Sequence, residues 1–505
     1  MPRELIPAAL QAVLASAAGV ALWIAWRAVS RVGDLSRVGD SWATRLVAAG
    51  FLLRAAAGVT LFWISYLRLP VMTTHYLGGG FWDFALDSDD YMALAGDAAS
   101  RGPLALLTLD RGKVSSVAYV QILAVAQILF GRASSVGLLL DCACFLAAAL
   151  ALVRWSASLG AAGRSPGLLA LVVLSLHPSW ILWSTQPLKD ALFGLLVIAW
   201  FCASRCWFEG SEPGARGRPA LWALVLAMVL YELAGLRAYF ALVLWLAFGA
   251  GLALSLLRPS PLQPSSRRRW RRVVAGASVW ILLSQVVVWS GGPLLPSTVR
   301  AVLMPYGSAL APESPAPTSG EQASGPLLRP LAKMREGFVT SGAASQISAG
   351  APEPVVAPPG PPPATSPISP PVAGPRPGWS RTLLAGLAAT FLPRVVGSSL
   401  GLFSIGGGRG AWAYVELDTL FFTTACVLSV LLTVRAARRA GRISPLALQA
   451  MLSALLIAVA LAYVVAVFGT LFRLREMILM PLSLAPLAAT VRRATGRETA
   501  ARAPE

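Results

Sequence analysis

Long apolar runs, each followed by a short polar segment, set the pattern of this chain. A helix needs roughly 20 apolar residues to cross a bilayer, and about ten or eleven runs approach that length. Because a chain in lipid must satisfy its own backbone hydrogen bonds, such runs form helices. We therefore expect an all-α, polytopic transmembrane protein with membrane helices at 5–26, 46–67, 134–153, 167–184, 191–207, 219–235, 238–257, 273–290, 415–434, 446–468 and 477–491.

Some apolar runs have special roles in this interpretation. Residues 116–130 are short and end at a Gly-Arg pair, so we expect an interfacial or re-entrant helix. The run 382–401 is not expected to span the membrane fully. Residues 5–26 are too long for the core of a signal peptide, and we expect them to remain as a membrane anchor.

Composition supports a membrane protein and excludes two other classes. The chain is 56% hydrophobic and only 13% charged, which is too few charges to cover a soluble fold of 505 residues. The formal net charge of +19 could suggest nucleic-acid binding. However, the arginines form short clusters between the apolar runs, as the positive-inside rule expects of cytoplasmic loops. Anionic lipid headgroups are therefore the expected partner, and nucleic acid is not.

The arginine clusters also predict which segments face each side of the membrane. Clusters at 27–45, 258–272 and 435–442 are typical of cytoplasmic loops. The alternation is consistent only if 116–130 and 382–401 do not cross, which places the N-terminus outside. The opposite, outer face then receives 68–115, 185–190, 236–237, 291–414 and 469–476.

The long segment between the two groups of membrane helices differs from the rest of the chain. Residues 311–378 are rich in Pro, Ala, Ser and Gly, a composition that cannot bury a core. Within this segment, apolar residues at helical spacing predict a short amphipathic helix over 327–340. The predicted regions are N-terminal membrane helices 1–67, first outer loop 68–133, central membrane helices 134–290, outer loop 291–381, C-terminal membrane helices 382–491 and a basic tail 492–505.

The densest acidic cluster lies in the first outer loop. Asp87, Asp89 and Asp90 fall within four residues, and carboxylates so close repel one another. Such a cluster can raise the proton affinity of one member for acid–base work, or hold a divalent cation such as Mg²⁺ or Mn²⁺. The structural alternative is a helix that starts near Tyr91 and is capped by Asp89 or Asp90. No metal-ligand signature occurs elsewhere, and the five cysteines are interpreted as buried small hydrophobic residues.

Three other groups of charged residues are candidates for substrate binding on the outer face. His177, Lys189 and Asp190 flank a proline-bounded helix break, where the positive end of the next helix favours anions. Snorkelling and capping of a helical hairpin are the structural alternative for Lys189 and Asp190. Further candidates for holding a phosphate are Arg237, Arg473, Arg475 and Lys333, and the buried charges Arg54 and Asp141 are expected to pair with each other or with another helix.

The order of these features resembles the GT-C superfamily of polytopic glycosyltransferases, and most of all bacterial members of glycosyltransferase family 39. The features are the acidic first outer loop, short helices at the membrane surface, a helical hairpin with proline and acid at its tip, and later loops with arginines. The resemblance covers roughly 46–257 and, more loosely, 385–491. It implies a catalytic aspartate in the cluster Asp87 to Asp90 and a second acid at Asp190. The Lys189-Asp190 pair departs from the single acid of the family.

The resemblance implies an inverting transfer of sugar from a polyprenyl-phosphate donor to a glycan, lipid or protein acceptor. The expected location is the bacterial inner membrane, with the reaction on its outer face. Two alternatives remain open from the sequence. One is a polymerase or ligase of lipid-linked oligosaccharides, which depends on arginine and histidine rather than on an acidic cluster. The other is a flippase or transporter, whose two related halves the sequence does not show.

Overall fold

The computed structural model places most of the apolar runs but not the long outer loop. It describes residues 2–32, 41–71, 75–85, 87–103, 106, 109, 116–131, 135–210, 219–257, 266–291, 347–348, 379–400, 404–405, 412–465 and 468–490. Lys333 and the predicted amphipathic helix at 327–340 lie outside these residues, as does the basic tail.

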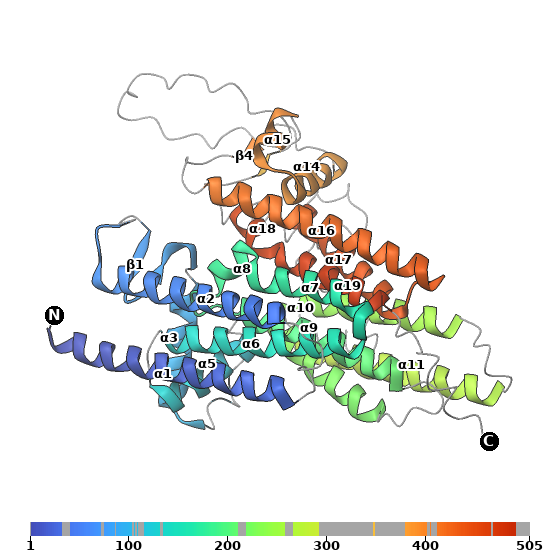
Figure 1. Ribbon diagram of the computed structural model, residues 1–505, viewed down its shortest axis with the longest axis horizontal. Coiled ribbons are helices and arrows are strands. Elements are labelled where there is room, and N and C mark those ends of the chain that lie inside the picture. The colour runs from blue at the N-terminus through green and yellow to red at the C-terminus, as the bar shows by residue number, and fades with distance from the viewer. Residues whose placement is uncertain are drawn as a thin grey trace, which may run out of the picture. The chain divides into compact units, whose positions relative to one another are not determined.

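The described chain is all-α apart from two very small sheets (Figure 1), which confirms the expected fold class. Six of its helices are long and apolar enough to cross a membrane. The protein is therefore a multi-pass membrane protein. These six helices are α2 (Ser41–Leu67), α6 (Ser135–Ser158), α9 (Asp190–Gly210), α10 (Pro219–Leu257), α16 (Trp412–Ala440) and α17 (Pro445–Val464).

The described residues give six such helices against the ten or eleven predicted, and part of the difference is that one predicted helix is divided and two others are joined. The predicted helix 167–184 divides at His177 into α7 (Arg164–Leu176) and α8 (Pro178–Trp183). The predicted helices 219–235 and 238–257 form one element, α10, with non-helical backbone at Arg237. At about 1.5 Å per residue, its 39 residues would reach about twice the thickness of a hydrocarbon core. Either side of Arg237 is thus long enough for one crossing.

The short runs form short helices, as expected. Helix α5 (Val117–Phe130) has 14 residues, or about 21 Å, which is less than a bilayer core. The run 382–401 divides at Pro393 into α14 (Trp379–Phe391) and α15 (Arg394–Ser399). The other helices are α1 (Pro2–Val32), α3 (Asp87–Ser100), α11 (Ser266–Gly291), α18 (Phe468–Leu474), α19 (Glu476–Ala489) and the 3₁₀ helices η2 (Asp83–Ala85) and η3 (Gly160–Gly163).

A small antiparallel hairpin in the first outer loop was not predicted. Strands β1 (Tyr76–Gly78) and β2 (Phe81–Trp82) pair through a turn of glycines with positive φ. The buried indole of Trp82 donates to the Leu61 carbonyl of α2 at 3.0 Å, so the hairpin is fastened to the end of a membrane helix. This attachment fixes where the chain enters α3.

The chain divides into two compact units. Unit 1 comprises Met1–Ala311, Ala425–Ala454 and Glu476–Glu505, and unit 2 comprises Pro312–Thr424 and Leu455–Arg475. In unit 1, α6 packs against α1, α2, α7 and α9, and α9 also packs against α10 and α19. In unit 2, β3 (Ile347–Ser348) pairs with β4 (Ser404–Ile405), and α14 packs near α18. The polar groups described next belong to unit 1 unless stated otherwise.

Candidate functional site

The break between α8 and α9 places polar residues at the start of an apolar helix. Pro187 precedes the break, and α9 begins at Asp190, which is completely buried. His177 is also completely buried, at the start of α8, where its Nδ1 accepts the Trp180 backbone N–H at 3.4 Å. His177 therefore acts as a helix cap in this structure.

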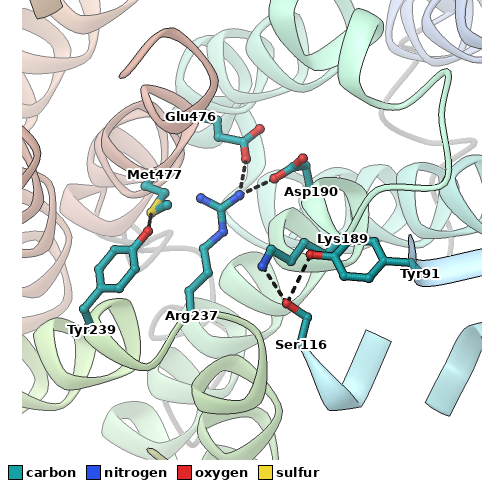
Figure 2. A network of polar contacts seen from close by, with 8 residues as sticks. All are labelled: Tyr91, Ser116, Lys189, Asp190, Arg237, Tyr239, Glu476 and Met477. Carbon is teal, nitrogen blue, oxygen red and sulfur yellow. Dashed lines mark hydrogen bonds and ion pairs between the residues drawn. The ribbon is translucent and has the colours of Figure 1, made fainter. Parts of the chain in front are cut away.

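Helix α10 is interrupted at Arg237, a charged residue between two apolar stretches. Arg237 has φ −153° and ψ 84°, so the helix is broken at that residue. Its buried guanidinium donates to Oδ1 of Asp190 on α9 and to Oε1 of Glu476 on α19, the latter at 3.5 Å (Figure 2). It also lies over the ring of Phe193 at 4.9 Å from the centroid. One cation thus links three helices of unit 1.

Helix ends help to balance the charges of this cluster. Asp190 and Glu476 each lie in the first turn of a helix, where the positive end of the helix dipole stabilises a carboxylate. A buried ion pair is tolerated only when such additional interactions offset the loss of hydration. The cluster of Arg237, Asp190 and Glu476 therefore has the arrangement of a buried structural clamp.

Lys189 belongs to a second group of side chains beside this clamp. Its Nζ donates to Oγ of Ser116 at 2.5 Å, and the Tyr91 hydroxyl lies 3.4 Å from the same Oγ. The ammonium also lies 5.8 Å from the centroid of the Tyr91 ring. Figure 2 shows these three residues to the right of Arg237 and below Asp190, with Tyr239 on the left of Arg237. An ammonium and two hydroxyls, next to the N-terminus of α9, make a suitable environment for an anion.

The predicted catalytic aspartates occupy the first turn of α3. Asp87, Asp89 and Asp90 are all exposed, and α3 begins at Asp87 rather than near Tyr91. The prediction that Asp89 or Asp90 caps this helix is therefore wrong, because both lie inside its first turn. Tyr91, the next residue, is buried and contacts Ser116. The contacts of Tyr91 thus connect the acidic turn to the group around Lys189.

The arginines of the C-terminal region belong to unit 2. Arg475 is completely buried and donates to Oγ1 of Thr419 at 2.7 Å and to the Ala389 carbonyl at 2.6 Å. Its Nη1 lies 3.9 Å from the buried carboxylate of Asp418. Arg473 is half-buried on α18. The guanidinium of Arg475 is therefore engaged by its own unit, and its predicted contact with a phosphate stays a prediction.

Sequence reasoning missed three residues of the site. Ser116 and Tyr91 are ordinary polar residues in a loop and a helix, and their meeting with Lys189 depends on the packing of α3 and α5. Glu476 directly follows Arg475 in the sequence and is not among the predicted site residues. The signal that could have identified it is a carboxylate directly before the apolar run 477–491. Over the described part of the chain, no three His, Cys, Asp or Glu residues gather in a way that could hold a metal ion.

No protein-family model, curated protein or solved structure matches this chain.

Proposed function

We propose that this protein is a glycosyltransferase of the GT-C type in the bacterial inner membrane. It would move a sugar from a polyprenyl-phosphate donor to an envelope glycan, lipid or protein on the outer face. The observation that carries the proposal is the pair of contacts from Ser116 to Lys189 and to Tyr91. Through these contacts, Lys189 at the start of α9 lies close to Tyr91, which directly follows the acidic first turn of α3.

The two groups suit the two charges that develop in such a transfer. An acceptor hydroxyl oxygen attacks the anomeric carbon and forms the new glycosidic bond, while the bond from that carbon to the phosphate oxygen breaks. The electron pair of the broken bond leaves with the polyprenyl phosphate, and the acceptor proton passes to an aspartate carboxylate. Lys189 offsets the charge on the leaving phosphate, and Asp87, Asp89 or Asp90 accepts the proton. Direct displacement inverts the anomeric centre.

The buried clamp has a supporting role in this proposal. Arg237 is neutralised by Asp190 and Glu476, and a phosphate would have to displace one of these carboxylates to bind it. We therefore assign the phosphate to Lys189. Arg237 and Asp190 hold the start of α9, the helix that immediately follows Lys189, in place.

The test is sugar transfer by the purified, reconstituted protein with polyprenyl-phosphate-linked sugars as donors. Replacing Asp87, Asp89 or Asp90 singly with Asn keeps the size of the side chain and removes its proton affinity. Loss of a general base typically costs about 10²–10⁴-fold in rate, so one of the three variants should lose at least that much. The matched control is Asp97→Asn on the same helix, where the carboxylate is exposed and paired with Arg101 at 2.6 Å.

The outcome discriminates between the proposed function and its rivals. If all three single variants transfer sugar at the wild-type rate, the acidic cluster is not catalytic. A ligase of lipid-linked oligosaccharides would show that result, because its activity would not need these carboxylates. If the reconstituted protein moves lipid-linked sugars across the membrane but transfers none of them to an acceptor, the enzymatic proposal is overturned.

A further inference from the structure

Asp141 is a carboxylate in the interior of the helix bundle that the proposed mechanism does not use. It lies on α6, is completely buried, and neither oxygen receives a hydrogen bond from a side chain of the residues that the structure describes. The backbone N–H of Leu188 interacts with it and also donates to the Gln186 carbonyl at 2.6 Å. A charge in this position is costly unless something neutralises it.

Arg54, the partner suggested by the sequence, is occupied elsewhere. Its Nη1 donates to the carbonyls of Gly50 at 3.0 Å and Ser175 at 2.9 Å, and its Nη2 donates to Leu174 at 2.6 Å. Its guanidinium also stacks over the ring of Phe145 at 4.2 Å. Arg54 thus binds α7 rather than Asp141, and it acts on Asp141 only through space.

The other groups that face Asp141 do not supply a positive charge. Asp190 on α9 is a second carboxylate, and Cys142 follows Asp141 on α6. Tyr119 on α5 is completely buried, and its hydroxyl also has no hydrogen bond within the described residues. From α7 come the carbonyls that Arg54 has taken. An ionised Asp141 would therefore have a second anion nearby and no paired cation among the described residues.

We propose that Asp141 is a proton-binding site inside the membrane bundle and holds one proton at neutral pH. A proton is the cation that a single buried carboxylate can bind without further ligands. Within the described residues, no cluster of three acidic, histidine or cysteine side chains offers a metal ion the ligands it needs. The proton removes the repulsion between Asp141 and Asp190, and leaves Arg237 to pair with Asp190 and Glu476. The inference is independent of the proposed glycosyltransferase activity.

Infrared spectroscopy tests this proposal directly. The full-length protein, in a detergent without ester groups, should show at pH 7 the carbonyl stretch of a protonated carboxylic acid. That band should shift in heavy water and should be absent from Asp141→Asn. It should persist in Asp97→Asn, where the replaced carboxylate is exposed. If the acid band is unchanged in Asp141→Asn while a carboxylate band is lost, Asp141 is ionised and hydrated, and the proposal is overturned.

The pH dependence of unfolding gives a second and separate measurement. A proton held in the folded but not the unfolded chain makes the folded state less favourable as pH rises, once an unfolded aspartate has ionised near pH ~4. One such proton shifts the unfolding equilibrium by about tenfold per pH unit. The midpoint temperature of the wild type should therefore fall relative to that of Asp141→Asn as pH increases. If the midpoint temperatures of the two proteins change with pH in parallel, the proposal is contradicted. If Asp141→Asn does not fold, the wild type alone provides the test, and the absence of the acid band at pH 7 would contradict the proposal.

Discussion

Arg237 is the residue whose removal we expect to destabilise the protein most. Arg237→Met leaves Asp190 and Glu476 buried without the cation that links them. Breaking a buried pair by removing one partner typically costs about 3–5 kcal/mol. The free energy of unfolding in detergent should fall by that amount, and Arg237→Lys should recover part of it because it restores the charge without the forked geometry.

An exposed ion pair supplies the control for this prediction. Arg205 and Glu209 are one turn apart on α9, and the Glu209 side chain is 59% exposed. Exposed pairs of this spacing contribute about 0.3–0.5 kcal/mol, so Glu209→Gln should change stability very little. An equal loss in Glu209→Gln and Arg237→Met would show that the buried clamp has no special importance.

Lys189 gives a prediction for binding. Lys189→Met removes the ammonium that contacts Ser116 while keeping the unbranched apolar part of the side chain. Losing one charge-assisted hydrogen bond typically costs about 1.5–3 kcal/mol, so binding of polyprenyl phosphate should weaken by about 10- to 150-fold. Calorimetric titration with the phosphate lipid measures this directly. Ser184→Ala, which removes a buried hydroxyl bonded within its own helical turn, is the comparison and should bind normally.

At this scale the sequence predicted several polar residues but not their partners. Lys189 and Asp190 were identified because they flank a proline-bounded helix break, and Arg237 because it is a charged residue between two apolar runs. Their pairing was not predictable, because Arg237 lies 47 residues from Asp190 and 239 residues from Glu476. Such distant contacts depend on which helices pack together, and a pattern of polar and apolar positions along one chain does not contain that information.

Among the elements, α14 and α17 approach each other very closely at a glycine of unit 2. A Cβ added to Gly386 on α14 would overlap the backbone carbonyl of Ala462 on α17, well inside van der Waals contact. A backbone group cannot rotate away, so Gly386→Ala should force the two helices apart. Overpacking of this kind typically costs about 1–3 kcal/mol, and the midpoint temperature of unfolding should fall accordingly.

Gly19 on α1 is the matched control for this substitution. A Cβ there would meet nothing within 4 Å. Alanine is favoured over glycine in a helix by about 1 kcal/mol, so Gly19→Ala should be neutral or slightly stabilising. A larger loss of stability in Gly19→Ala than in Gly386→Ala would contradict this account of the α14–α17 contact.

The breaks between helices were the most predictable elements, since prolines and charged residues mark them locally. The breaks near Pro187 and Arg237 were recognised from the sequence, and α5 is short as expected. The β1–β2 hairpin was not predicted. Its strands have only three and two residues. A hydrogen bond from the indole of Trp82 to a carbonyl of α2 attaches the hairpin to that helix. A tertiary contact of this kind leaves no periodic signal in so short a segment.

For the whole molecule, we predict that 68–115 and 435–442 face opposite sides of the membrane. Ser100 and Arg442 are both exposed, so each accepts a cysteine without disturbing packing. In a variant lacking the five native cysteines, an impermeant maleimide should label Ser100→Cys only from the outer face of sealed vesicles. Arg442→Cys should be labelled only from the cytoplasmic face. Labelling of both positions from one side would overturn the predicted orientation.

The three members of the buried clamp leave the ribosome in a defined order. Asp190 is synthesised first, Arg237 follows 47 residues later, and Glu476 follows 239 residues after Arg237. Because chains fold from the N-terminus as they are made, Arg237 can meet a carboxylate as soon as α10 enters the membrane. The second carboxylate arrives with α19. A chain that stops before Glu476 therefore lacks part of the clamp. The contact between Arg237 and Glu476 stabilises only a chain that has been translated through α19.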